Sequence, residues 1–142
     1  MIAARSYPGA CHCRALGFEY RTALEPRKWP VRACQCTFCR AHGGLTTSDP
    51  RGSLTLFERV PGALNRYRFG RKITDFWVCR KCGTYIGATM ESGGRSYGIV
   101  NVRALQPTPD QLNEPQPMNY DGEATAERVS RREERWTPIA GD

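Results

Sequence analysis

The stretch Cys79-Arg80-Lys81-Cys82-Gly83 decides which kind of fold this chain adopts. Two cysteines separated by two residues have the spacing of a zinc knuckle, and a glycine directly after them supplies the backbone freedom that such a tight turn often needs. A knuckle provides two sulfur ligands, whereas structural zinc takes four. The stretch therefore predicts a metal-pinned fold in which a second cysteine pair completes the site.

The candidate for the second pair is the stretch Cys11-His12-Cys13. On a β-strand, residues two apart point to the same face, so Cys11 and Cys13 can present their sulfurs together while His12 faces away. We therefore expect a structural role for His12. If the two pairs meet, their four sulfurs form a tetrahedral site of the closed, structural kind.

The remaining cysteines form a third group in the stretch Cys34-Gln35-Cys36-Thr37-Phe38-Cys39, so none of the seven is left over. Catalytic zinc usually keeps three protein ligands and leaves one position open for water or substrate. With the outer pairs closing one site, Cys34, Cys36 and Cys39 make a compact three-thiolate cluster with one coordination position unfilled. Two zinc ions per chain are expected on this interpretation.

Three other interpretations of the cysteines stay open at this point. Two disulfides with a free thiol would need an oxidising compartment, and the sequence carries no secretory signal. An iron–sulfur cluster is compatible with thiolate ligands, because thiolates alone do not select the metal. A single zinc ion with the other cysteines serving as redox thiols is the third alternative. The metal content would distinguish them.

His42 follows Cys39 by three residues. It is a candidate for the fourth coordination position, or for an acid or base beside the cluster. The alternative is a surface or hydrogen-bonding histidine, which is the commoner role of a lone histidine in a segment flanked by glycine.

Length and composition limit the fold and the location. The 142 residues suit one domain, and ten prolines and fourteen glycines break it into short elements, so long helices and repeats are not expected. No apolar run approaches the roughly 20 residues of a membrane span, and the N-terminal segment lacks an apolar stretch of signal-peptide length. We therefore expect a soluble, cytoplasmic protein without a membrane partner.

The rest of the chain predicts a mostly antiparallel β domain. Short runs rich in aromatic and β-branched residues alternate with Gly, Pro, Asn or Asp, and the expected strands are Leu16–Tyr20, Leu54–Phe57, Leu64–Phe69, Ile73–Val78, Tyr85–Thr89 and Tyr97–Val102. Four prolines between Gln106 and Pro117 predict a surface strap without regular structure.

The C-terminal segment Glu123–Trp136 is the only helix of length that the sequence predicts. Glu127 and Arg131 stand four residues apart in the favourable order, and Pro138 closes the segment. Its charges form no one-sided stripe, so we expect a solvated helix or a partly disordered tail. The predicted organisation is a zinc-binding domain at 1–121 and a helical or extended tail at 122–142.

These motifs resemble the glutathione-dependent formaldehyde-activating enzyme family, which also includes centromere protein V. The resemblance accounts for all seven cysteines and their order over residues 9 to about 103. The segments that carry it are Gly9–Cys13, Ala33–Arg40 and Cys79–Thr84, with support from Tyr67–Gly70 and Asn101–Arg103. One departure is Arg14, which stands where many members of the family have glycine.

The resemblance implies a β-tent fold, in which small antiparallel sheets are pinned by zinc. It also implies a division of the ligands: Cys11, Cys13, Cys79 and Cys82 for structural zinc, and Cys34, Cys36 and Cys39 for catalytic zinc. The implied activity is that of a carbon–sulfur lyase acting on a thiol–aldehyde adduct such as S-hydroxymethylglutathione, formed from glutathione and formaldehyde. Arg32, Arg40, Arg66 and Arg68 are candidates for pairing with the carboxylates of such a substrate.

A zinc-stabilised binding module without catalytic activity, for nucleic acid or an acidic partner, is the alternative. Residues 1–82 carry 15 basic and 5 acidic side chains, whereas residues 83–142 carry 6 and 9. Against nucleic acid, no basic run exceeds two residues and no aromatic-rich signature accompanies the charge. Thiolate-bound zinc sites are also anionic, so part of the basic charge is expected to balance them. Short strands at the edge of a sheet can pair with a second copy of the chain, so a homodimer also stays an open alternative.

Overall fold

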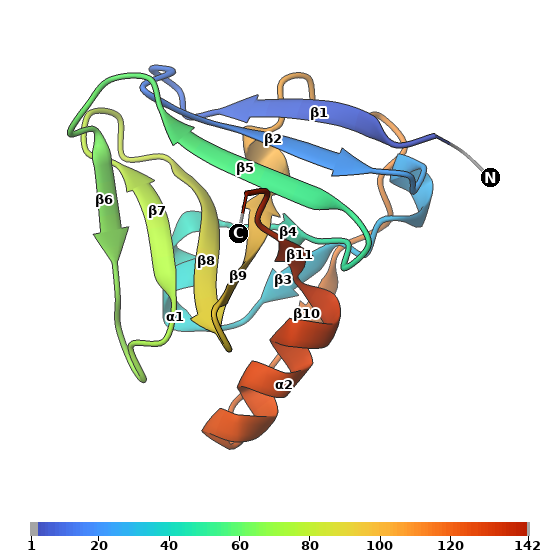
Figure 1. Cartoon of the computed structure of the whole chain (residues 1–142), viewed down its shortest axis with the longest axis vertical. Coiled ribbons are helices and arrows are strands. Elements are labelled where there is room, and N and C mark those ends of the chain that lie inside the picture. The colour runs from blue at the N-terminus through green and yellow to red at the C-terminus, as the bar shows by residue number, and fades with distance from the viewer. Residues whose placement is uncertain (1–2, 142) are drawn as a thin grey trace.

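The computed structural model describes residues 3–141, which form a three-stranded and an eight-stranded β-sheet (Figure 1). The strands are β1 (Arg5–Ala10), β2 (Leu16–Thr22), β3 (Arg32–Cys34), β4 (Thr46–Thr47), β5 (Ser53–Glu58), β6 (Leu64–Tyr67), β7 (Asp75–Cys79), β8 (Tyr85–Ser92), β9 (Arg95–Asn101), β10 (Gln116–Met118) and β11 (Thr137–Pro138). The helices are α1 (Thr37–His42) and α2 (Thr125–Arg135), with short 3₁₀ turns at Pro26–Lys28 and Val102–Ala104.

The small sheet has the order β1-β2-β5, and the large sheet has the order β10-β3-β4-β9-β8-β7-β6, with β11 paired to β9. Every pairing except β10 with β3 is antiparallel among the named strands. In Figure 1 the small sheet crosses above the large one, and α2 lies at the opposite end of the molecule. The predicted mostly β class, with small antiparallel sheets and a short C-terminal helix, is confirmed.

Adjacent residues on the central strands of the large sheet point to opposite faces, as the pleat requires. Trp77, Ile86 and Val100 belong to the core shared with the small sheet, together with Phe18 and Leu54 of β2 and β5. Burial of these side chains between the sheets is the main apolar contribution to stability.

The neighbours of those residues face the other side of the large sheet. Phe76, Tyr85 and Ile99 pack there with Cys39 of α1 and with Trp136, which directly follows α2. The second face therefore carries both α-helices and one of the cysteine groups, and the candidate site lies here.

The predicted strands are present, with boundaries shifted by a few residues, but several short elements were not predicted. Strands β1, β3, β4 and β11 and helix α1 show little periodicity because each is short or lies at an edge. The strap prediction is wrong at Gln116–Met118, where β10 pairs in parallel with β3. Pro117 is tolerated because β10 is an edge strand, where a residue without an N–H need not complete a ladder.

The C-terminal helix is confirmed at Thr125–Arg135, and the chain continues beyond it into the large sheet. Trp136 is buried, and Ile139 packs against the core and forms a bridge to Leu54 of β5. These contacts fasten the end of the tail to both sheets. The division of the chain near residue 121 stays a prediction. Among residues 3–141, no helix combines the length and apolar character required to cross a membrane.

Candidate functional site

The first cysteine cluster joins two hairpin turns, one from each sheet. Cys11 and Cys13 lie in the turn between β1 and β2, and Cys79 and Cys82 lie at the turn between β7 and β8. All four sulfurs lie within 4.8 Å of one another; the Sγ atoms of Cys11 and Cys13 are 3.8 Å apart, and those of Cys13 and Cys79 are 3.6 Å apart. The expectation that Cys11 and Cys13 lie on a strand is wrong, since a turn brings them together.

Backbone N–H groups point at these sulfurs. Leu16 N–H donates to Cys11 Sγ (3.2 Å), and Lys81 N–H donates to Cys79 Sγ (3.4 Å). Gly83 has φ 76°, and its N–H donates to the carbonyl oxygen of Cys79 (2.9 Å), which closes the knuckle turn. These hydrogen bonds thus fix the positions of the sulfurs within the turns.

Arg14 occupies a strained position in the turn beside this cluster. Its φ is 68°, in the left-handed region that glycine tolerates better than other residues, and its N–H donates to the Cys11 carbonyl oxygen (3.0 Å). The guanidinium donates to Gln106 Oε1 (3.0 Å). His12 is exposed, and its backbone N–H donates to Thr84 Oγ1 (3.3 Å), so it supports the turn through its main chain.

Burial and hydrogen bonding shift the pKa values of the thiols in the first cluster in opposite directions. Burial raises the pKa of the Cys11 thiol to about 12. Burial also acts to raise the pKa of Cys82, but hydrogen bonds from Thr84 and backbone groups lower it to about 5. Filling the site with a metal ion therefore requires at least the Cys11 proton to leave.

The second cluster comes from one short segment, where β3 ends and α1 begins. Cys34 ends β3, Cys36 is the N-cap of α1, and Cys39 lies inside α1 with 5% of its surface exposed. Their sulfurs lie within 4.8 Å of one another, and Cys39 N–H donates to Cys36 Sγ (3.4 Å). A helix N-terminus favours the thiolate form of a capping cysteine.

Hydrogen bonds among the three thiols set their pKa values apart. Cys34 and Cys39 donate to Cys36, and with backbone N–H groups they lower the pKa of Cys36 to about 2. The same contacts raise the pKa of Cys34 and, together with burial, that of Cys39. Cys36 is therefore the most acidic thiol of the cluster.

All three of these cysteines line a cavity of about 430 Å³. Phe69 and Phe76 supply part of its apolar wall. Its charged lining is strongly basic, with Asp121 the one acidic residue among the described lining. The basic lining residues are Arg32, Arg40, Arg71, Lys72, Arg128, Arg131 and Arg132. The cavity therefore places three sulfur ligands beside a positive surface that suits an anion.

His42 does not join this arrangement. Its ring lies 4.4 Å from the Phe38 ring, on the aromatic cluster beside α1, and its centroid is 5.7 Å from that of Tyr85. It belongs neither to the three-sulfur cluster nor to the described cavity lining. The structure thus brings Cys34, Cys36 and Cys39 together but leaves His42 apart from the cavity.

Of the four arginines considered from the sequence, two reach the cavity. Arg32 and Arg40 line it. Arg66 and Arg68 are not among the described lining residues and instead pair with Asp75, at 3.5 Å for the Arg66 contact. Those two are therefore committed to an ion pair on the strand surface.

Helix α2 contributes functional candidates that the sequence did not indicate. Arg128, Arg131 and Arg132 occupy positions i, i+3 and i+4, which places them on one face of the helix. Arg131 pairs with Glu123 at 2.9 Å, rather than with the expected Glu127. The spacing of the three arginines was the available signal, but without the fold it indicates only a solvated basic face.

Comparisons with known proteins agree with these features. A family model described as glutathione-dependent formaldehyde-activating enzyme matches residues 6–120. Among solved structures, a crystal structure of a Rhodobacter sphaeroides protein is similar, with 31% sequence identity and a TM-score of 0.59. The match covers 78% of this chain and 99% of that chain. A comparison with curated proteins gives no match. Since the family model spans most of the chain, including both cysteine clusters, the chain belongs to the glutathione-dependent formaldehyde-activating enzyme family.

Proposed function

We propose that this protein is a zinc-dependent carbon–sulfur lyase that makes and breaks a thiol–aldehyde adduct such as S-hydroxymethylglutathione. The observation that carries the proposal is the cluster of Cys34, Cys36 and Cys39 on the wall of a cavity of about 430 Å³. A closed structural cluster would have no reason to face such a space, whereas a reaction site requires one.

The donor sets of the two clusters fit zinc in different ways. Four sulfurs within 4.8 Å of one another match a closed tetrahedral site, which Cys11, Cys13, Cys79 and Cys82 would hold. The three sulfurs of the second cluster match an open site with room for one further ligand. Sulfur-only donor sets also suit iron, so metal analysis is part of the test.

The reaction itself balances without a redox step. The thiol sulfur forms a bond to the aldehyde carbon, the C=O double bond becomes a single bond, and the thiol proton ends on the oxygen; the lyase direction reverses each change. Zinc, when bound by the three thiolates, supplies positive charge that lowers the pKa of a substrate thiol. We therefore favour delivery of a positioned thiolate over strong activation of the carbonyl group.

The chain's own residues position the reactants. The Phe69 and Phe76 rings restrict water on one side of the cavity, and the basic side chains orient an anionic thiol. Holding two reactants in one small space removes much of the entropic cost of a bimolecular addition.

The test is turnover of formaldehyde and glutathione by the zinc-loaded protein. We expect two zinc ions per chain, thiol-dependent aldehyde consumption, and loss of turnover in Cys36→Ala with the fold retained by circular dichroism. Cys36 is the suitable position because it is only partly buried. A fully zinc-loaded protein that neither consumes aldehyde with thiol nor binds glutathione would reject the proposal.

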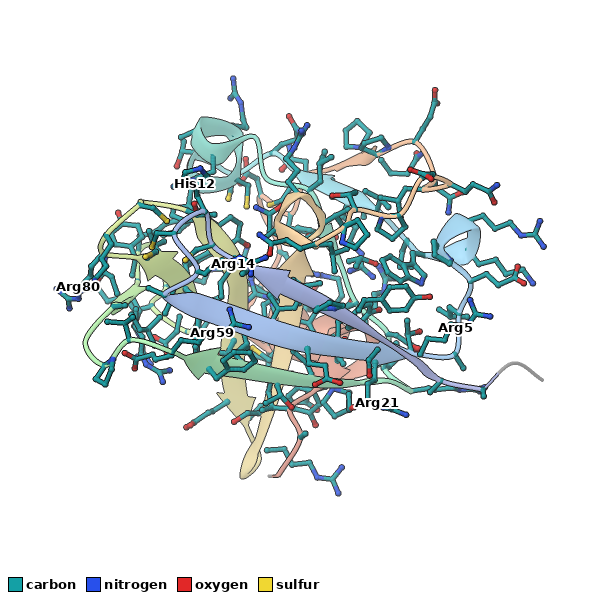
Figure 2. All side chains as sticks on the ribbon, turned by 90° about the horizontal axis from the view of Figure 1, so that it is seen from above. Arg5, His12, Arg14, Arg21, Arg59 and Arg80 are labelled. Carbon is teal, nitrogen blue, oxygen red and sulfur yellow. The ribbon has the colours of Figure 1, made fainter. Side chains whose placement is uncertain are left out.

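A second candidate, a binding module, is favoured by one surface. Figure 2 shows Arg5, Arg14, Arg21, Arg59 and Arg80 on the side of the molecule that carries the small sheet, and all five are exposed. Binding to duplex or single-stranded nucleic acid that weakens steeply with salt would support this candidate. Absent binding, or a flat response to salt, would discard it.

A further inference from the structure

Helix α2 forms one wall of the cavity although it lies outside the matched segment. The family model ends at residue 120, whereas α2 spans Thr125–Arg135. Even so, three arginines of α2 line the same cavity as the three-cysteine cluster. This part of the cavity is therefore supplied by sequence beyond the family match.

Two of the three arginines already have a counter-charge. Arg128 and Arg131 both pair with Glu123, at 3.2 and 2.9 Å, and the paired side chains are mostly buried. Arg131 also stacks on Tyr120, with its guanidinium carbon 3.6 Å from the ring centroid. These contacts hold both side chains in place and neutralise part of their charge.

Arg132 has no such partner. Its Nη1 donates to Thr74 Oγ1 (2.5 Å), and the guanidinium lies over the Trp136 ring at 4.6 Å from its centroid. Its Nε is buried without a hydrogen-bond partner, and no carboxylate within residues 3–141 forms an ion pair with it. A buried donor of a charged group left unpaired is costly. The Arg132 side chain also lines the cavity, where a bound anion would supply the missing counter-charge.

The surroundings of Arg132 reinforce this shortage of negative charge. Burial, followed by the nearby Arg131 and Arg128, lowers the pKa of Arg132 to about 10. Glu123 acts in the opposite direction. Arg132 lines the same cavity as the three-cysteine cluster. The side chain thus remains charged at neutral pH within a cavity that is rich in cations.

We propose that Arg132, which lies outside the family match, is the residue of this cavity that binds a carboxylate group of the thiol substrate. The inference rests on the proposed function and names the residue that anchors its substrate. With the carboxylate held at Arg132, the substrate spans the cavity so that its sulfur faces the three-cysteine cluster. Neutral thiols lack this anchor and bind more weakly.

The test measures binding directly, without turnover. The probe is S-methylglutathione, whose blocked sulfur cannot be delivered as a thiolate, and its diethyl ester, which lacks both carboxylates. We expect isothermal titration calorimetry on the zinc-loaded protein to show the acid binding at least about tenfold more tightly than the ester. In Arg132→Gln, the acid should lose most of its advantage over the ester, while the affinity of the ester stays unchanged.

Arg135→Gln is the matched control. It removes the same charge from the same helix, but its side chain is exposed and lies outside the described cavity lining. We expect it to bind the acid as the unaltered protein does. If Arg132→Gln does not fold, Arg132→Lys takes its place, with a smaller loss because it keeps the charge but not the planar pair of donors.

The outcomes separate this inference from the proposed function. Equal binding of acid and ester, equal weakening of both by Arg132→Gln, or the same loss in Arg135→Gln would overturn the role of Arg132, whatever the turnover. An Arg132-dependent preference for the acid supports it even if no thiol–aldehyde turnover is detected; in that case the proposed reaction fails and the anion site stands.

Discussion

The two cysteine clusters differ in how the chain assembles them. The four-cysteine cluster joins turns whose members Cys13 and Cys79 are 66 residues apart, and it fastens the small sheet to the large sheet. The three-cysteine cluster spans only Cys34–Cys39 and faces a cavity. A metal ion in the first closes a long loop and contributes to folding, whereas a metal ion in the second orders little additional chain. Sequence separation therefore distinguishes the cluster proposed to be structural from the cluster proposed to be catalytic.

The largest effect is expected from removing one ligand of each cluster. Structural zinc contributes roughly 10–16 kcal/mol in zinc-finger peptides, as much as the ~5–15 kcal/mol net stability of a domain. Cys82→Ser should therefore unfold the protein, whereas Cys36→Ser should keep its thermal transition and lose one zinc ion. Both cysteines are partly buried, so the pair is well matched. Equal melting temperatures for the two variants would break the distinction.

Lowering the pH should release zinc from the two clusters one after the other. Cys34 and Cys39 have raised pKa values and Cys36 has a lowered one, so zinc binding there releases two protons and weakens as the pH falls. With three protein ligands instead of four, this cluster should lose zinc first, and activity should disappear before the fold. Zinc retention and circular dichroism measured from pH 8 to pH 5 check this order. Loss of the fold before loss of activity would reverse the assignment.

A smaller effect is expected at the strained turn beside the four-cysteine cluster. Because Arg14 has φ 68°, Arg14→Gly should stabilise the protein by about 0.5–1 kcal/mol, after the loss of the contact with Gln106 is included. The stability of Arg14→Asn should lie between that of the unaltered protein and that of Arg14→Gly, since asparagine tolerates this backbone region better than arginine. Urea unfolding of the zinc-loaded proteins gives the order, and a destabilised glycine variant would show that the turn is not strained.

An effect of similar size on stability is expected at Glu123. The guanidinium of Arg131, opposed by burial and aided by Arg128, lowers the pKa of Glu123 to about 2, below its unfolded value. Its contribution is therefore fully present above about pH 4.5 and is lost as the pH falls toward 2. Glu123→Gln should cost no more than about 1 kcal/mol at pH 7 in thermal or urea unfolding. A loss as large as that of Cys82→Ser would show that α2, and not the metal, holds the fold together.

Local signals in the sequence were sufficient for the strands and for the grouping of the cysteines. The alternation along Leu16–Tyr20 and the spacing of Cys79 and Cys82 can be recognised from neighbouring residues alone. The family resemblance indicated that the two outer cysteine pairs, which are distant in sequence, share one site. Cys11 and Cys13 were placed on a strand because spacing by two suits both a strand and a tight turn. The hydrogen bonds that close this turn decide between them.

The cationic wall of the cavity was beyond prediction for a different reason. Arg132 acquires its role only because Trp136 and β11 dock the tail against the large sheet, which turns one face of α2 toward the cysteines. No local pattern in the tail encodes that placement. The same holds for Arg32 and Arg40, which reach the cavity, against Arg66 and Arg68, which pair with Asp75.

The most direct test of the two-cluster account is anomalous diffraction at the zinc absorption edge from crystals of the unaltered protein. We expect two peaks, one among the sulfurs of Cys11, Cys13, Cys79 and Cys82, and one beside Cys34, Cys36 and Cys39 with a non-protein atom as its fourth ligand. A single peak, or a protein side chain completing the three-cysteine site, would contradict it.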